Sequence, residues 1–384
     1  MGQRAPNVCM ICDDFLPAFT GVGVHVQSIS QELARRGYRV IVIAARRPGQ
    51  PREETWLGVK ICRVFSLKVY GYYQALPARS TIRRILKEND ISLIHHHYLG
   101  LLLQRAERVG ASLNLRQVYT YHMTPDLITE PWPLRPYRKL IASKVKQFCN
   151  RMNLVIVPSE KLASQIVRQG VRVPIRYITN PVPFGETKNF VPAPREPGFT
   201  IYYVGRLSPE KNLPYLFTAF AGLLSKLPDA MLWIAGQGPE EAHLKKMCQK
   251  MGLVPRVQFL GFLEQQALAR YYAACDVFVL PSIEETQSIV ALEAMWFGKP
   301  LIVTNRIISA TELVDPEING YIVDVNSPND LTQRLFLLSQ DQALRDRMGA
   351  AGKQKAQAYR LDSMIDQLEI AYRDVSSSAG EHRA

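Results

Sequence analysis

The sequence predicts an α/β protein made of two doubly wound domains that face a central cleft. Short apolar segments of strand length alternate with amphipathic helical patterns along the whole chain, and this order is typical of parallel sheets with helices on both faces. The length of 384 residues exceeds one ordinary core. The alternation is interrupted once, at residues 181–198, which contain five prolines. We therefore expect a domain boundary at this segment.

The first half of the chain contains seven segments with a strand pattern. Helical patterns lie between them, for example residues 24–36, which Gly37 is expected to end. The predicted strands are residues 7–12, 40–44, 59–64, 92–95, 117–120, 154–158 and 175–178.

The second half repeats the same alternation and then ends in helices. Residues 328–376 have a helical pattern, and the residues after them are expected to fray. The predicted strands are residues 199–204, 231–235, 257–259, 277–280, 301–304 and 320–323.

Composition and charge restrict the class of protein. No apolar run reaches the roughly 18 residues of a membrane span, and the N-terminus lacks a signal-peptide layout, so we expect a soluble cytoplasmic chain. Residues 1–190 carry 28 Lys and Arg against 12 Asp and Glu, whereas residues 191–384 carry 19 against 22. The basic half predicts an anionic partner surface, either lipid headgroups or nucleic acid.

Candidate site residues in the first half follow strands, because ligands of such sheets bind at the carboxyl ends of strands. Gly21 and Gly23 lie in a predicted strand-to-helix turn, where backbone N–H groups can approach a phosphate. His122 follows the strand at residues 117–120. Residues 95–97 are three consecutive histidines, but neighbouring residues of an extended segment point to opposite faces, which argues against a metal site there.

Candidates in the second half are cations, glycines and carboxylates. Arg206 and Lys211 flank a loop that leads into a helix, and two cations beside a helix N-terminus suit a diphosphate. Glu285 lies in a loop before a helix that begins near Ser288. Glu293 lies two turns further on, and both carboxylates can accept hydrogen bonds from hydroxyls. A nucleotide-sugar, with a phosphate centre and hydroxyls at both ends, fits this set.

Together these motifs resemble those of the retaining glycosyltransferases of family 4, which have the GT-B fold of two Rossmann-like domains. The motifs are Gly21–Val22–Gly23, Tyr121-His122, Val157-Pro158-Ser159, Asn180-Pro181, Gly205-Arg206-Leu207 with Glu210-Lys211-Asn212, Gly236-Gln237-Gly238-Pro239, residues 277–282, and the element from Glu285 to Glu293 that ends in Gly298-Lys299-Pro300.

The resemblance implies a domain organisation. It places an acceptor domain at residues 1–183 and a donor domain at residues 184–360. Residues 361–384 would form a helix that crosses back to the first domain.

The resemblance also implies roles for single residues. Arg206 and Lys211 would neutralise the donor diphosphate, Glu285 and His122 would contact the transferred sugar, and Glu293 would hold the ribose. The implied catalytic residues are His122, Arg206, Lys211 and Glu285. The implied donor-binding residues are Gly21, Gly23, Gly205, Gly236, Gly261, Phe262, Leu263, Thr286, Gln287, Ser288, Ile289 and Glu293. A UDP-hexose is the expected co-substrate. The sequence contains no Asp-x-Asp, so no metal or other cofactor is expected.

Two features of the sequence depart from the family pattern. Val22 separates two glycines that are usually adjacent, and Ser288 stands where relatives usually have glycine. Both lie where donor phosphate would bind, so a nucleotide-sugar-binding protein with little turnover stays an alternative.

The expected acceptor is a lipid or lipid-linked molecule. Glu285-Thr286-Gln287 resembles the variant of diacylglycerol glucosyltransferases. Residues 79–88 and 135–150 form basic amphipathic patterns near Trp132 and Tyr137, which favours an anionic membrane surface. We therefore expect a peripheral enzyme at the inner face of the membrane. A soluble, polysaccharide or lipopolysaccharide acceptor remains an alternative, and nucleic acid is disfavoured because no recognition module is present.

Overall fold

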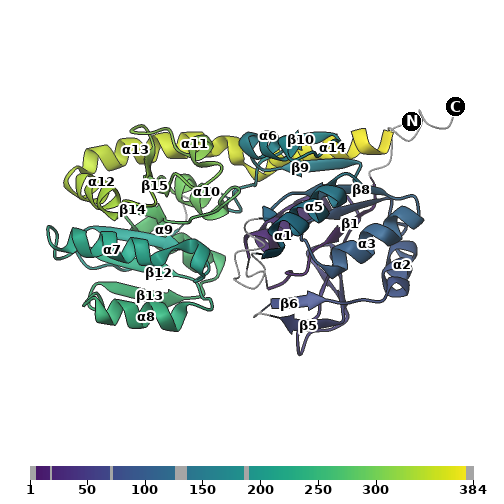
Figure 1. Ribbon diagram of the computed structural model, residues 1–384, viewed down its shortest axis with the longest axis horizontal. Coiled ribbons are helices and arrows are strands. Elements are labelled where there is room, and N and C mark those ends of the chain that lie inside the picture. The colour runs from purple at the N-terminus through teal and green to yellow at the C-terminus, as the bar shows by residue number, and fades with distance from the viewer. Residues whose placement is uncertain (1–5, 18–19, 70–71, 126–135, 186–189, 378–384) are drawn as a thin grey trace. The chain divides into compact units, whose positions relative to one another are not determined.

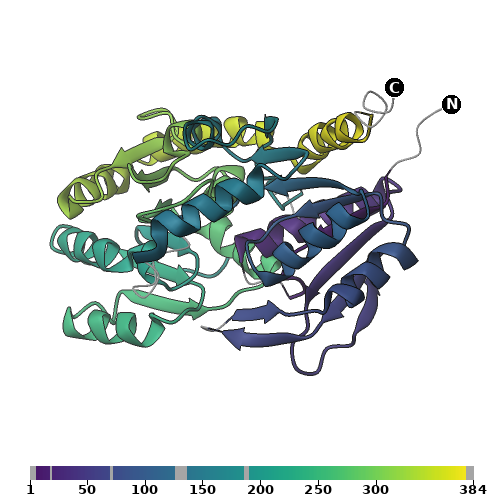
Figure 2. The same ribbon diagram turned by 45° about the vertical axis from the view of Figure 1, so that its right-hand side comes forward.

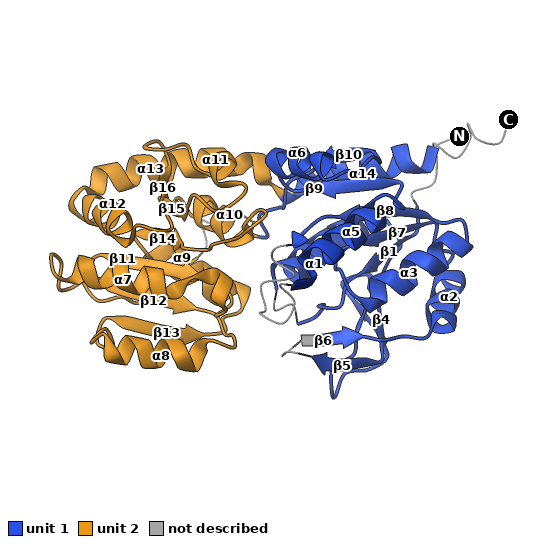
Figure 3. Ribbon diagram, in the orientation of Figure 1, with its two compact units in different colours: residues 1–183, 361–384 blue, residues 184–360 orange. Residues whose placement is uncertain are grey.

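The chain divides into two compact units, residues 1–183 with 361–384 (unit 1) and residues 184–360 (unit 2), as Figure 3 shows. The computed structural model describes residues 6–17, 20–69, 72–125, 136–185 and 190–377. Each unit is a doubly wound α/β structure, which confirms the predicted fold class.

Unit 1 is built on a sheet with the strand order β10-β9-β8-β7-β1-β2-β4-β3 (Figure 1). All neighbours in this sheet are parallel except β3 and β4, and a separate hairpin is formed by β5 and β6. The strands are β1 (Val8–Ile11), β2 (Val40–Ala45), β3 (Glu53–Trp56), β4 (Val59–Val64), β5 (Ser66–Val69), β6 (Tyr72–Ala75), β7 (Leu93–His96), β8 (Arg116–Thr120), β9 (Leu154–Val157) and β10 (Ile175–Tyr177).

The C-terminal helix α14 (Leu361–Ser377) belongs to unit 1 and packs on its first helix. Ile365, Leu368 and Tyr372 share a core with residues of α1 (Gly21–Arg35), and Arg36 pairs with Asp366 at 2.5 Å. The other helices of unit 1 are α2 (Arg79–Glu88), α3 (Leu101–Ser112), α5 (Arg138–Cys149) and α6 (Glu160–Arg168).

Unit 2 is built on a fully parallel sheet with the order β13-β12-β11-β14-β15-β16. Helices lie on both of its faces (Figure 2). The strands are β11 (Thr200–Val204), β12 (Met231–Ala235), β13 (Val257–Gly261), β14 (Val277–Leu280), β15 (Leu301–Thr304) and β16 (Gly320–Val323). The helices are α7 (Leu213–Leu224), α8 (Glu241–Lys250), α9 (Gln265–Ala274), α10 (Ile289–Trp296), α11 (Ala310–Leu313), α12 (Pro328–Gln340) and α13 (Gln342–Ala356).

Every predicted strand is present, with bounds that differ by at most two residues. Three strands were not predicted: β3, β5 and β6. Strands β3 and β5 are exposed along most of their length and so lack the apolar run that marks a buried strand.

The strand order reverses direction at β11 in unit 2 and at β1 in unit 1. Strand β11 lies between β12 and β14, and β1 lies between β7 and β2. At such a switch point the loops that follow the two neighbouring strands diverge to opposite faces and leave room for a ligand. Loops at these two places are therefore the first positions to examine for a site.

Candidate active site

The switch point of unit 2 brings the predicted Lys211 and Glu285 together. The loop after β11 contains a short 3₁₀ turn, Pro209–Lys211, and the loop after β14 contains Glu285. Lys211 Nζ donates to Glu285 Oε1, and both side chains are largely buried. A backbone hydrogen bond of 2.9 Å from Ile283 N to Glu210 O ties the two loops together. The pair joins residues that lie 74 positions apart in the sequence.

Arg206 has its own carboxylate in the same loop. Its Nη2 lies 2.9 Å from Glu210 Oε1, and the Ser208 hydroxyl donates to the same oxygen. Tyr203, on β11, holds the loop to the strand before it, because its hydroxyl donates to the carbonyl of Arg206 at 3.0 Å. Each predicted diphosphate cation is thus held by one acidic side chain.

The predicted glycines Gly205, Gly236 and Gly261 lie in one row at the carboxyl ends of β11, β12 and β13. Gly205 N donates to Ala235 O at 3.0 Å, and Gly236 N donates to Gly261 O at 2.7 Å. Gly236 has φ +134°, and a Cβ built on it would lie 1.9 Å from the carbonyl oxygen of Gly205. Only glycine fits there, because backbone meets backbone. Gly205 and Gly236 therefore allow the loop after β11, which carries Arg206, to lie against the loop after β12.

The start of α10 is capped by its own N-terminal residue. Ser288 Oγ accepts from Ala291 N at 3.4 Å, and Thr286, Gln287 and Ser288 are buried. Backbone N–H groups at a helix start can reach phosphate oxygens, and the Ser288 hydroxyl already accepts from one of them, that of Ala291.

Glu293 lies inside α10 and faces α9 rather than a cation. Tyr272 donates to Glu293 Oε2 at 2.8 Å, and both side chains are buried. Burial raises the pKa of Glu293 to about 8, against a lowering effect of the Tyr272 hydroxyl. Glu285 and Glu293 therefore have different partners and different electrostatic environments.

We expect Glu293→Gln to change how stability depends on pH. Between pH 4.5 and about 8 the folded chain holds a proton that the unfolded chain releases. The contribution of this carboxyl to stability is therefore full below pH 4.5 and is lost as the pH rises through 8, in total about 5 kcal/mol. The variant should become more stable relative to the parent protein as the pH rises, as measured by urea unfolding at pH 5, 7 and 9.

Glu241 on α8, which is half-buried and pairs with Lys245 at 2.7 Å, supplies the control for removal of a carboxylate. Because Glu241→Gln removes a charge near the surface rather than one enclosed in the core, it should change stability by about 1 kcal/mol at most. Parallel curves for Glu293→Gln and the parent would show that this carboxyl is ionised in the folded chain at neutral pH.

Gly261, Phe262 and Leu263, which the resemblance assigns to donor binding, lie at the end of β13 and directly after it. Gly261 has φ +69°, Phe262 is 44% exposed and Leu263 is half-buried. Ile289, at the first position of α10, is buried. An exposed aromatic ring beside backbone groups is suited to contact a planar base.

Gly21 and Gly23 are not in a loop, as predicted, but in the first turn of α1. Thr20 caps this helix, because its Oγ1 accepts from Gly23 N at 3.1 Å while its own N and Oγ1 donate to Asp14 Oδ2 at 2.8 and 2.7 Å. The Gly23 N–H donates to the cap, so it is not available to the phosphate that the sequence analysis expected to approach there. The helix starts earlier than predicted because Thr20 is an effective N-cap, which outweighs the low helix propensity of glycine.

His122 lies after β8 in unit 1 and is surrounded by other imidazoles. Its Nε2 lies 3.3 Å from Nδ1 of His97, and its ring centroid lies 4.7 Å from that of His25 on α1. Burial lowers the pKa of His25 to about 3, although the nearby Asn180 side chain opposes the shift, and it holds the pKa of His97 and His122 well below the usual value. These rings are neutral at physiological pH.

The alternation expected for the three consecutive histidines is present. His95 donates or accepts at Tyr372 Oη and Thr120 Oγ1, both at 2.7 Å, and its ring lies 3.9 Å from that of His97. His96 points to the other face, where Nε2 lies 2.8 Å from Gln117 Oε1.

The sequence analysis assigned no role to Glu210, Tyr272 or His25. Glu210 was visible as a carboxylate four residues after Arg206, which is a common spacing for an ion pair in a turn. Nothing local in the sequence marks Tyr272 or His25, because their partners lie on other elements.

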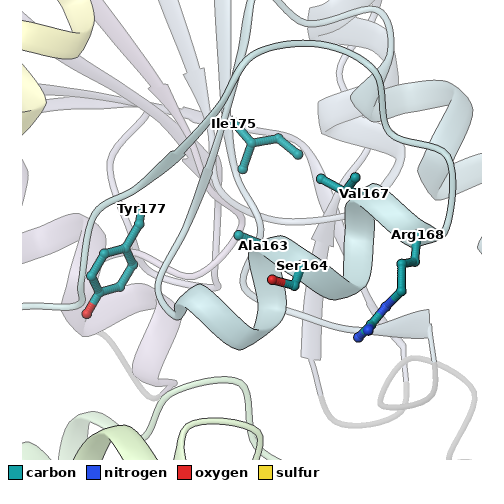
Figure 4. A pocket seen from close by; sticks show the side chains of 6 residues that line it. All are labelled: Ala163, Ser164, Val167, Arg168, Ile175 and Tyr177. Atoms are coloured by element: carbon teal, nitrogen blue, oxygen red, sulfur yellow. The ribbon is translucent and has the colours of Figure 1, made fainter.

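Unit 1 also has a shallow hollow. It is formed by α6 and β10 (Figure 4) and contains one cation, Arg168. Its lining consists of Ala163, Ser164, Val167, Arg168, Ile175 and Tyr177, none of which is a predicted site residue. We assign no role to it.

Comparison with protein families finds two matches that adjoin each other. Residues 19–185 match Glycosyltransferase Family 4, and residues 185–355 match Glycosyl transferases group 1. The chain is 26% identical over 318 residues to the alpha-monoglucosyldiacylglycerol synthase of Streptococcus pneumoniae, covering 77% of this chain and 70% of that protein. It is also 26% identical over 392 residues to the phosphatidyl-myo-inositol mannosyltransferase of Mycobacterium leprae, covering 98% of both.

Solved structures share the fold. The sucrose-phosphate synthase from Thermosynechococcus elongatus superposes with a TM-score of 0.81 at 22% identity, over 98% of this chain and 100% of that chain. Anabaena HepE in complex with UDP and glucose superposes with a TM-score of 0.76 at 17% identity, over 95% and 99%.

Proposed function

Because the chain belongs to the family 4 glycosyltransferases, we propose that it transfers a hexose, with retention, from a UDP-hexose to a lipid or lipid-linked acceptor. The observation that carries this proposal is the pairing of Lys211 with Glu285 at the switch point of unit 2. This pair places a cation and a carboxylate where a diphosphate and sugar hydroxyls would bind.

The two cations would act on the leaving group. When the bond between the sugar C1 and the β-phosphate oxygen breaks, negative charge grows on the diphosphate. Arg206 and Lys211 would stabilise that charge by exchanging their carboxylate partners for phosphate oxygens. The acceptor oxygen would bond to C1 on the face that the diphosphate leaves, and its proton would pass to a phosphate oxygen.

Carboxylates and an imidazole would position the donor. Glu285 would accept hydrogen bonds from the hydroxyls of the hexose, and Glu293 would accept them from the ribose. His122, as a neutral imidazole, would contact the hexose near C1. Gly205, Gly236 and Gly261 would let the backbone approach the nucleotide.

A lipid acceptor is supported by the helices of unit 1. Tyr137 (56% exposed), at the N-cap of α5, and Leu140 (52%), within α5, lie next to the exposed basic residues Lys139 and Lys144. Apolar and cationic side chains together favour an anionic bilayer surface. Trp132, which the sequence analysis placed in this surface, lies outside the described residues. Within the described residues, no helix is long and apolar enough to span a membrane.

The names of two relatives above point to lipid substrates. The S. pneumoniae protein is a monoglucosyldiacylglycerol synthase, and the M. leprae protein acts on phosphatidyl-myo-inositol. A sucrose-phosphate synthase shares the same fold, so a soluble acceptor is the second candidate.

The test is release of nucleotide from a panel of UDP-, GDP- and ADP-hexoses, with and without anionic liposomes that contain diacylglycerol. Release from one donor that liposomes increase would support the whole proposal. If liposomes do not change the release of nucleotide, the protein is still a transferase, but the proposal of a lipid acceptor is overturned. Donor binding without release would overturn catalysis.

A matched pair of variants tests whether α5 binds an anionic membrane surface. Lys139→Glu/Lys144→Glu on α5 should weaken flotation with anionic liposomes. Lys246→Glu/Lys250→Glu on α8 changes the net charge equally, at exposed positions of unit 2, and should leave flotation intact. Equal loss in both variants would show only a general charge effect.

A further inference from the structure

Three histidines from three different elements of unit 1 form a compact group. His25 lies on α1, His97 follows β7 and His122 follows β8. One ring nitrogen of each lies within 4.8 Å of one nitrogen of each other ring, and all three side chains are buried.

The group is distinct from the run of consecutive histidines. His95 is held by hydrogen bonds from both ring nitrogens, and His96 faces the other side of the sheet. Only His97 of that run joins the group. Neighbouring histidines of one extended segment point to opposite faces and so cannot share an ion. Histidines from three separate elements are not restricted in this way.

Ring nitrogens of His25 and His97 are poorly satisfied. Among the described residues, neither nitrogen of His25 makes a hydrogen bond of good geometry, although the Asn180 side chain is close enough to raise the pKa of His25, and Nε2 of His97 makes none. The hydrogen bond between His97 and His122 is long, at 3.3 Å. Buried polar groups without partners are uncommon in folded proteins and favour a missing ligand as their explanation.

We propose that His25, His97 and His122 bind one divalent transition-metal ion of the zinc class, with a fourth position open. Imidazole nitrogens coordinate Zn²⁺ at about 2.0–2.1 Å, which puts three ligand atoms of a tetrahedral site about 3.3 Å apart. The three ligand atoms lie within 4.8 Å of one another in the structure, so the imidazole rings must rotate toward one another to complete the site. A bound ion joins the N-terminal part of α1 to the carboxyl ends of β7 and β8.

Metal binding has one consequence for His122, and it rests on the proposed function. An ion that occupies a His122 nitrogen prevents that imidazole from contacting the donor hexose. Zn²⁺ should therefore inhibit transfer competitively with the donor. If Zn²⁺ binds the three histidines but leaves turnover unchanged, the sugar contact is wrong and the metal site stands.

The direct test uses the full chain purified without a histidine tag and stripped with a chelator. After equilibrium dialysis against Zn²⁺, elemental analysis should find one tightly held ion per chain. His25→Gln should weaken Zn²⁺ affinity at least tenfold, and so should His97→Gln. His243→Ala, at an exposed position of α8, should keep the parental affinity. No stoichiometric ion in the parent chain, or equal affinity in His25→Gln, would overturn the site.

A second measurement covers the case in which the variants fail to fold. Co²⁺ added to the parent chain should produce the intense visible absorption of a tetrahedral site, and Zn²⁺ should remove it. X-ray absorption should find about three imidazole nitrogens at the bound ion. A weak octahedral spectrum, or fewer imidazole ligands, would overturn the proposal without any variant.

Discussion

Lys211→Ala should lower turnover with the best donor by on the order of 10²-fold or more, while the protein stays folded. In the proposed reaction Lys211 stabilises negative charge that appears on the diphosphate only as the sugar leaves. Its loss should therefore reduce kcat more than it raises KM for the donor. The measurement is steady-state turnover of the donor, with circular dichroism and thermal unfolding as the check of folding.

The ion pair itself complicates this variant, because Glu285 loses its partner. Lys211→Ala leaves a largely buried carboxylate unpaired, which costs stability and can distort the loop after β14. Lys211→Ala/Glu285→Ala separates the two effects. If Lys211 only pairs with Glu285, the double variant should be no slower than Glu285→Ala. If Lys211 acts on the leaving group, the double variant should be slower than Glu285→Ala. Parental turnover in Lys211→Ala would contradict the assignment.

Glu285→Gln should also lower turnover by on the order of 10²-fold or more, but it should affect the binding of UDP differently. The amide keeps the size of the side chain and removes its charge. The hexose then loses a charged acceptor for its hydroxyls. Lys211, in contrast, loses the carboxylate that neutralises it and can approach the diphosphate more readily.

The affinities for two ligands, UDP and the UDP-hexose, distinguish these two effects of the Glu285 charge. Calorimetry should show that Glu285→Gln binds UDP, which has no hexose, as tightly as the parent or more tightly. The change in its affinity for the UDP-hexose, relative to the parent, should be less favourable than the change in its affinity for UDP. Equal weakening for both ligands would indicate that Glu285 only maintains the loop. Glu284→Gln, at the preceding position, provides the control for removal of a charge from the same loop.

Local pattern was enough to predict the elements and most of the residues that follow them. A buried parallel strand needs a short apolar run, and an amphipathic helix needs apolar residues three or four positions apart, so both can be seen in a few consecutive residues. The predicted strand 59–64 coincides with β4, and α10 ends at Trp296, two residues before Gly298, which has φ +67°. Lys211 and Glu285 were found because each follows such a strand.

Exposed strands and helix starts were less predictable. The strands β3 and β5 have little buried apolar surface, so their sequences resemble loops. The early start of α1 depends on the Thr20 cap and its contact with Asp14, which together fix the first turn. Helix propensity alone would place the start after the glycines.

Periodicity and neighbours along the chain were enough to predict the two doubly wound sheets, the loops that carry the site and the residue types in them. The partners of these residues became visible only in the folded chain: Lys211 with Glu285, Glu293 with Tyr272, and His97 with His25 and His122. Each of these contacts joins separate elements whose neighbourhood depends on strand order and helix packing. That order results from burial of the whole core, which no short segment encodes.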